Sequence, residues 1–143
     1  AAPIARRDQR PPLPLHAGAA PRALLAFRPE EEWEAYIERN TPLVRFTPST
    51  PDTPTALRKL LRETRAQGYA LSDQDVTVGV AAVGVPVFDY RGEVRAALSF
   101  SGVRESVLGP DFERWRDLLI EAGREVSRAL GADLAGKDIV DFG

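Results

Sequence analysis

The 143-residue sequence contains no cysteine, no methionine and a single histidine. Without cysteine the chain forms no disulfide and offers no thiolate for catalysis, and a lone histidine leaves little for a zinc site. Runs of about 18 apolar residues and signal-peptide patterns are also missing, so we expect neither a membrane span nor secretion. Because methionine is absent, the chain does not begin at a natural translation start, and we expect a fragment, a processed chain or part of a longer protein.

Positive charge is not concentrated anywhere in the chain, whose formal net charge is −2. Lysine and arginine are scattered through segments that we expect to be helical, so the dense positive field that a phosphate backbone requires is missing. We therefore expect no DNA binding by this chain itself. With 43% hydrophobic and 28% charged residues, the composition is typical of one globular domain with a single core.

The most informative segment runs from Gly68 to Gly102 and is typical of two long strands joined by a tight turn at 89–92. Because side chains alternate between the faces of a strand, small or hydroxylated residues fall in a row on one side of each strand. These rows are Val80, Ala82 and Gly84 on the first strand and Ala97, Ser99 and Ser101 on the second, with Val94, Leu98 and Phe100 on the opposite side.

Two such rows, if they face the same way, would leave a hollow that contains hydroxyl groups. That combination is typical of a small-molecule pocket, which has mostly apolar walls and a few polar groups. We expect the hollow to lie beneath the final long helix. The alternative is structural, because small residues also let a helix pack closely and a strand serine often bonds only to backbone or water.

Three helices are expected before these strands, at 20–26, 29–40 and 54–67. The third has the clearest limits, because Thr53 and Pro54 are typical of a helix start and Gly68 of a helix end. Because two strands alone are marginal, additional strands are expected from 1–15, from 43–46, from 69–72 or from chain outside this sequence.

After a loop at 102–109, a long helix is expected from Pro110 to Leu130, with an apolar stripe that covers one face of the sheet. The stripe comprises Phe112, Trp115, Leu118, Leu119, Ala122, Val126 and Leu130. Residues 132–143 lack periodicity and are interpreted as a C-terminal tail. The order of these elements predicts an α+β fold, an antiparallel sheet flanked by helices.

Four parts of the chain occur in an order and at a spacing typical of one protein family. They are PLHAGAAPRALLAF, FTPSTPDTPTAL, QGYALSDQDVTVGVAAVGVPVFDYRGEVRAALSFSG, and the long helix that follows. Together they resemble the effector-binding domain of IclR-type bacterial transcription regulators, over roughly Leu13 to Leu130.

The resemblance implies a fold like the GAF and profilin-like sensory domains, a cytoplasmic protein, and homo-oligomers built from dimers. It also implies a winged helix-turn-helix DNA-binding domain that is not present in this chain. On this basis residues 1–131 are interpreted as an effector-binding domain whose N-terminal part is incomplete.

The family's ligand site lies between the turn before the first short helix and the central sheet, and it accepts small carboxylates or aromatic acids. The lining implied for this chain is Leu13, Ala19, Ala20, Ser72, Val80, Ala82, Ser99 and Ser101. Backbone N–H groups of Ala19 and Ala20 would hold a carboxylate at the helix start, and the serines at 99 and 101 would donate hydroxyl hydrogen bonds.

Several positions depart from the family pattern. Where the family tends to have Gly-Ala-Gly-Lys, residues 19–22 are Ala-Ala-Pro-Arg, and Pro21 removes one N–H donor while Arg22 keeps a positive charge. Ser72 replaces a residue that is often acidic, and Ala82 one that is often Cys or Ser. Because the site is less polar, we expect an aromatic or alicyclic acid in preference to a two- or three-carbon acid.

Two other function classes stay open, an oligomerisation module with a degenerate pocket and a small serine esterase or amidase. The second would combine Ser99 with His16 and either Asp73 or Asp75. No G-x-S-x-G elbow is present, Ser99 is in the middle of a strand, and a lone histidine is most often structural. We therefore expect no enzyme, metal, cofactor or membrane contact, and as partners a small carboxylate effector and further copies of the chain.

Overall fold

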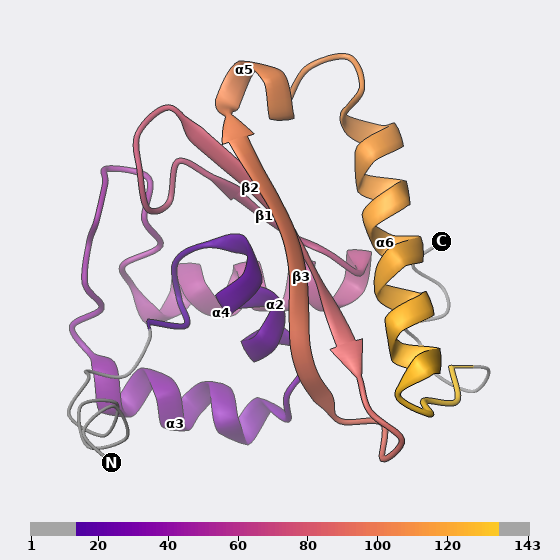
Figure 1. Ribbon diagram of the computed structural model, residues 1–143. Helices are drawn as coiled ribbons and strands as arrows, with labels where there is room; N and C mark the ends of the chain where they lie inside the picture. The colour runs from indigo at the N-terminus through magenta and orange to yellow at the C-terminus, as the bar shows by residue number, and fades with distance from the viewer. Residues whose placement is uncertain (1–13, 135–143) are drawn as a thin grey trace, which may run out of the picture.

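The computed structural model describes residues 14–134, and its elements form an antiparallel sheet with helices on both faces (Figure 1). The strands are β1 (Ala70–Asp73), β2 (Val80–Phe88) and β3 (Val94–Val103). The helices are α2 (Ala19–Ala26), α3 (Glu30–Asn40), α4 (Pro54–Gln67), α5 (Arg104–Val107) and α6 (Phe112–Ala129). Helices α2, α3 and α4 gather on one side of the sheet and α6 lies on the other. The predicted α+β class with an antiparallel sheet is confirmed.

The sheet has the order β1-β2-β3, and both strand pairs are antiparallel. In this register Ala82 lies opposite Ser72 on one side and Ser101 on the other, while Gly84 lies opposite Ser99. Residues directly opposite one another project from the same face of a sheet. The two predicted rows of small residues therefore share one face, which we call the small-residue face: Ala70, Ser72, Val80, Ala82, Gly84, Ala97, Ser99 and Ser101.

The tight turn between β2 and β3 forms where the sequence predicts it. The Gly92 amide donates to the carbonyl oxygen of Asp89 at 2.9 Å, and Oδ1 of Asp89 accepts from the amides of Arg91 and Glu93. Gly92 has a φ of 78°, a conformation that glycine adopts without a Cβ penalty. Local turn chemistry thus fixes the start of β3.

Both ends of α4 follow from local sequence. Oγ1 of Thr53 accepts from the Ala56 amide at 3.2 Å, and Gly68 ends the helix at a φ of 89° while its amide donates to the Thr64 carbonyl. The buried stripe of this helix, Leu57 and Leu61, packs with residues of α2 and α3 into the core of the helical layer.

The face that α6 turns to the sheet contains only part of the predicted apolar stripe, in which Phe112 and Leu119 pack against buried Ala81 and Val83. Ile120, Gly123 and Ser127 are its buried residues, whereas Leu118 and Val126 of the predicted stripe are 61% and 39% exposed. The reason is close contact: a Cβ added at Gly123 would lie 2.9 Å from Cγ2 of Val85. Small residues therefore determine how closely α6 packs on β2. Such residues contribute little to a hydrophobic pattern in a sequence.

Several predicted boundaries are also corrected. The 102–109 segment contains the short helix α5, and 43–46 forms no strand. The first of the two long strands, which the sequence predicts over 78–88, begins at Val80, because Gly79 adopts a φ of 85° within a turn. Residues 132–134 of the predicted tail pack against the sheet end, where Leu134 is buried beside Phe88 and Val94. The remainder of that tail, 135–143, and residues 1–13 of the candidate strand segment 1–15 lie outside the described residues.

Candidate effector site

The first turn of α2 rests directly on the small-residue face. A Cβ added at Gly84 would lie 2.7 Å from the carbonyl carbon and oxygen of Ala19 and 2.9 Å from the amide nitrogen of Ala20. Ala19, Ala23 and Ala70 are buried together, with Ala82 packed against them. The absence of bulk on this face thus lets the helix backbone, and not only its side chains, approach the strands.

This arrangement brings seven of the eight predicted site residues into one region. Ala19 and Ser72 are buried at 2% and 4% exposure, and Ala20 and Ala82 are half-buried. Val80, Ser99 and Ser101 lie on the same face but are exposed. Leu13 lies outside the described residues, so its predicted place in the lining remains a prediction.

The predicted enclosed chamber beneath the final helix is wrong in two respects. The small-residue face is turned toward α2, whereas α6 packs on the opposite face through Gly123 and Val85. In addition, the exposure of Ser99 and Ser101 leaves the β3 side of the region open among the described residues. What the structure contains is an open face of the sheet on which the first turn of α2 rests, with Ser72 of β1 and Ser101 of β3 on either side of Ala82.

Local sequence explains how the first turn of α2 is oriented. Gly18 precedes the helix at φ 95° and ψ 155°, and its carbonyl accepts from the Arg22 amide at 3.3 Å. First-turn N–H groups have no partner within their own helix, and Pro21 carries none, so Ala19 and Ala20 supply the donors at this end. These amides and the Ser72 hydroxyl are suited to an anion.

Charge on the strand side of the region is paired. The guanidinium of Arg104 donates to both carboxylate oxygens of Asp73, the residue after Ser72, at 2.6 and 3.1 Å. This hydrogen bond raises the pKa of Arg104 above its ordinary value. Asp73 therefore adds no uncompensated negative charge beside the site.

His16 has a structural role, as predicted. It is 2% exposed, and its Nε2 donates to the Val44 carbonyl at 2.7 Å, because a carbonyl only accepts. Nδ1 then accepts from the Tyr36 hydroxyl at 2.8 Å, and that hydroxyl accepts from the Leu15 amide. Both ring nitrogens are engaged, so the predicted alternative of a Ser99 and His16 catalytic pair is not formed.

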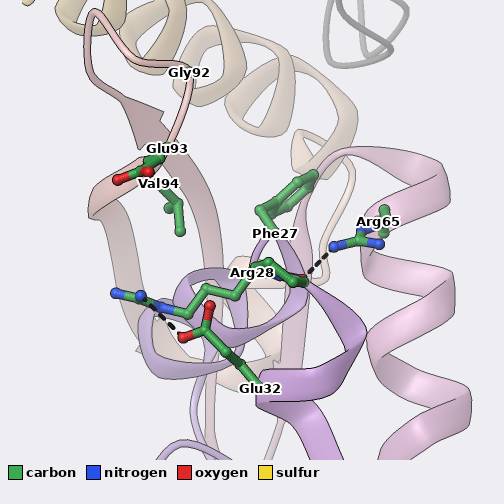
Figure 2. Close-up of a pocket in the computed structure, with 8 residues that line it drawn as sticks. Phe27, Arg28, Glu32, Arg65, Gly92, Glu93 and Val94 are labelled. Atoms are coloured by element: carbon green, nitrogen blue, oxygen red, sulfur yellow. Dashed lines mark hydrogen bonds and ion pairs between the residues drawn. The ribbon is translucent and has the colours of Figure 1, made fainter.

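A hollow of about 410 Å³ lies elsewhere, between the end of α2, the start of α3 and the β2–β3 turn (Figure 2). Its two guanidinium groups are already engaged: Arg28 pairs with Glu32 at 3.4 Å, and Arg65 donates to the Ala26 carbonyl at 2.9 Å. The hollow therefore offers an acid no free cation from these arginines. Among residues 14–134, no group of three or more acidic or imidazole side chains is placed to hold a metal ion.

The sequence reasoning missed the buried ion pair between Arg22 and Asp75, whose side chains are 1% and 7% exposed. The sequence identifies Arg22 only as a retained positive charge and Asp75 only as a candidate in the esterase alternative. No local signal could have found the pair, because 53 positions separate the two residues.

Comparison with known proteins agrees with this fold. Residues 11–128 match the family model described as bacterial transcriptional regulator IclR C-terminal. The HTH-type transcriptional regulator XynR of Escherichia coli is 40% identical over 119 residues, which are 83% of this chain and 47% of that protein. The chain thus spans about half the length of this curated relative.

Two solved structures extend the likeness. The crystal structure of the Thermotoga maritima IclR superimposes with a TM-score of 0.73 at 35% identity, over 82% of this chain and 47% of that one. The inducer-binding domain of the Acinetobacter transcription factor PobR, a double mutant in complex with 3-hydroxybenzoic acid, gives 0.72 at 28% identity, over 80% and 68%.

In the part of the chain that the structure describes, no helix has both the length and the apolar character needed to cross a bilayer. The family model spans most of the chain, the curated relative is a transcription regulator, and the sheet with its helices superimposes on solved members. The chain therefore belongs to the IclR family of bacterial transcription regulators and matches its C-terminal, effector-binding domain.

Proposed function

We propose that this chain binds a small organic acid, with an aromatic or alicyclic body, on the open part of the small-residue face beside the first turn of α2. Binding changes how associated subunits present a DNA-binding winged helix-turn-helix outside this chain. The protein that carries it is then a cytoplasmic homo-oligomeric regulator. Such control requires the acid to have different affinities for two subunit arrangements.

The contact between α2 and Gly84 carries this proposal. The Ala19 and Ala20 backbone lies against Gly84, and the next position of β2 on the same face is Ala82, which is flanked by Ser72 and Ser101. This grouping supplies N–H and O–H donors for a carboxylate and alanine surface for a ring. Hydrogen bonds to a charged group contribute about 1.5–3 kcal/mol each, enough to select an acid over its amide.

The ligand class is supported by chemistry and by a relative. Val80 is 37% exposed at the end of the row and, with half-buried Ala82, offers apolar surface to a ring. The PobR inducer-binding domain, which shares this fold, has been solved with 3-hydroxybenzoic acid. A benzoate is therefore the first ligand to test.

The test is a thermal-shift screen of the intact protein against 3-hydroxybenzoate, benzoate, cyclohexanecarboxylate, glyoxylate and pyruvate, followed by calorimetry. A ligand at about 100 times its Kd stabilises the folded state by roughly 2.7 kcal/mol, which raises Tm by several degrees. We expect a ring acid to raise Tm and benzamide to have no effect. Tight binding of glyoxylate or pyruvate without benzoates would refute the ligand class.

If no acid raises Tm, the chain is better explained as an oligomerisation module with a degenerate pocket. The exposure of Ser99 and Ser101 and of Leu118 on α6 is compatible with that second candidate. Its distinguishing result is self-association that no acid alters, measured by analytical ultracentrifugation.

A further inference from the structure

Arg22 joins α2 to β1, the two elements that hold Ala19, Ala20 and Ser72 of the proposed effector site. It belongs to α2, one turn after Ala19, and its side chain is almost fully buried. Its Nη2 donates to the carbonyl oxygen of Leu71, the residue before Ser72 in β1, while its Nη1 donates to Asp75 and, at 3.2 Å, to the His16 carbonyl. One side chain thus connects α2, to which it belongs, with β1 and with the segment that leads into α2.

We propose that Arg22, held by Asp75, is a positioning residue that sets the spacing between the Ala19 and Ala20 amides and Ser72, and thereby the affinity for the carboxylate. This inference rests on the proposed function above. It assigns Arg22 no contact with the ligand, because both of its Nη groups already donate to protein oxygens.

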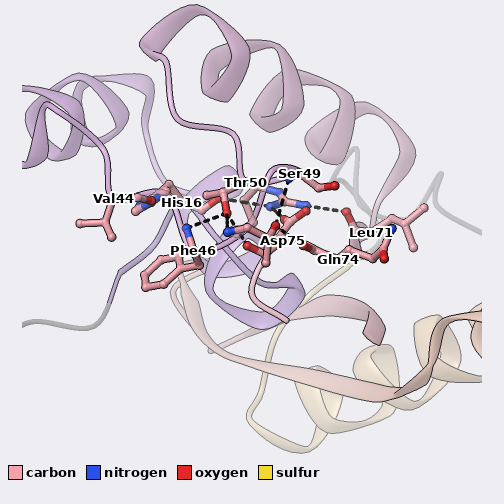
Figure 3. A network of polar contacts seen from close by, with 10 residues as sticks. His16, Val44, Phe46, Ser49, Thr50, Leu71, Gln74 and Asp75 are labelled. Carbon is pink, nitrogen blue, oxygen red and sulfur yellow. Dashed lines mark hydrogen bonds and ion pairs between the residues drawn. The ribbon is translucent and has the colours of Figure 1, made fainter. Parts of the chain in front are cut away.

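Asp75 is held in place by contacts that do not involve Arg22. The carbonyl oxygen of Asp75 accepts a hydrogen bond from Oγ1 of Thr50 at 2.6 Å. The same Oγ1 of Thr50 accepts from the amides of Phe46 and Thr47 at 3.0 and 2.9 Å. Figure 3 shows the network of polar contacts around the pair, in which His16 bonds to Val44 and Thr50 bonds to Asp75, while Arg22 joins His16, Asp75 and Leu71. The loop at 44–50 therefore fixes the residue to which α2 is tied.

The chemistry of this position needs a guanidinium. A planar fork reaches three acceptors in different directions at once, whereas an ammonium on a flexible stem is a point charge that cannot match that geometry. The partner matters as well, since a buried cation without its carboxylate is strongly unfavourable. In the described residues Nε of Arg22 is buried without a hydrogen-bond partner, so the two Nη groups make the hydrogen bonds of this guanidinium.

The experiment compares Arg22→Lys with wild type in the intact protein, using calorimetry with 3-hydroxybenzoate at a temperature where both are fully folded. We expect Arg22→Lys, which keeps the charge, to weaken binding about tenfold, the equivalent of one lost hydrogen bond to a carboxylate. Arg58→Lys is the matched control, because it alters an exposed bidentate pair with Glu34 far from the site, and its Kd should equal that of wild type.

Hydrogen exchange provides a second readout that needs no ligand. We expect Arg22→Lys to speed amide exchange in both 18–22 and 70–75, with α4 and α6 unchanged. If wild type binds the acid and Arg22→Lys binds it equally well, the inference is overturned and the proposed function stands. If wild type binds no acid, the proposed function fails, and exchange that does not change in both segments would overturn the bridging role as well.

Discussion

Replacing Ser127 by alanine tests whether α6 is fixed to the sheet by a hydrogen bond as well as by packing. Ser127 has no exposed surface, and its Oγ accepts from the Phe88 amide at 3.0 Å while donating to the Gly123 carbonyl at 2.8 Å. The first of these bonds joins the helix to the end of β2. In the alanine variant the Phe88 amide stays buried but loses its acceptor.

The expected cost follows from these contacts. A buried donor left without a partner costs about 1–3 kcal/mol. The Gly123 carbonyl keeps its backbone bond within the helix and loses little, and alanine recovers up to about 0.5 kcal/mol of helix propensity over serine. We therefore expect Ser127→Ala to lower the free energy of unfolding by roughly 1–2 kcal/mol.

The assay is urea unfolding, in which the midpoint should fall while the slope m stays constant. Ser106→Ala, an exposed serine of α5, is the control and should leave the midpoint unchanged. Exchange of the Phe88 amide should accelerate more than exchange of neighbouring β2 amides. Equal stability of the Ser127 and Ser106 variants would refute the claim that this bond helps seat α6.

Two further outcomes follow from local contacts. Thr53→Ala removes the acceptor for the Ala56 amide and should cost about 1 kcal/mol in urea unfolding, with exposed Thr55→Ala as a control near zero. The hydrogen bond from Arg58 lowers the pKa of Glu34 below its ordinary value of 4.5, so this pair stabilises the fold above that pH and the contribution is lost as pH falls through the folded pKa. The stability difference between wild type and Arg58→Gln should therefore shrink on acidification, and a difference that grows would contradict the assignment.

Much of the fold could be predicted where local chemistry determines the backbone. Thr53 and Gly68 mark the two ends of α4, and Asp89 and Gly92 mark the turn between the long strands. Strand alternation also grouped Ala82 and Gly84 of β2, and Ser99 and Ser101 of β3, and these residues share one face because this turn sets the register of β2 with β3.

What the sequence could not supply depends on contacts between distant segments. The packing of α6 on β2 depends on the contact of Gly123 with Val85. Only part of the apolar stripe therefore packs on the sheet, while Leu118 and Val126 are exposed. For the same reason the sequence predicts the small-residue face beneath the final helix, whereas the structure places it beneath α2. Alternation tells which residues share a face, but it does not tell whether α2 or α6 covers it.

The most direct measurement is calorimetric titration of 3-hydroxybenzoate into the intact protein and into two leucine variants of β3. Ser101→Leu adds bulk on the small-residue face, and Ala96→Leu adds the same bulk at an exposed position on the opposite face of the strand. If the acid binds beside the first turn of α2, Ser101→Leu should abolish the heat of binding and Ala96→Leu should retain the wild-type Kd. Binding that survives Ser101→Leu unchanged would contradict the placement of the effector on this face.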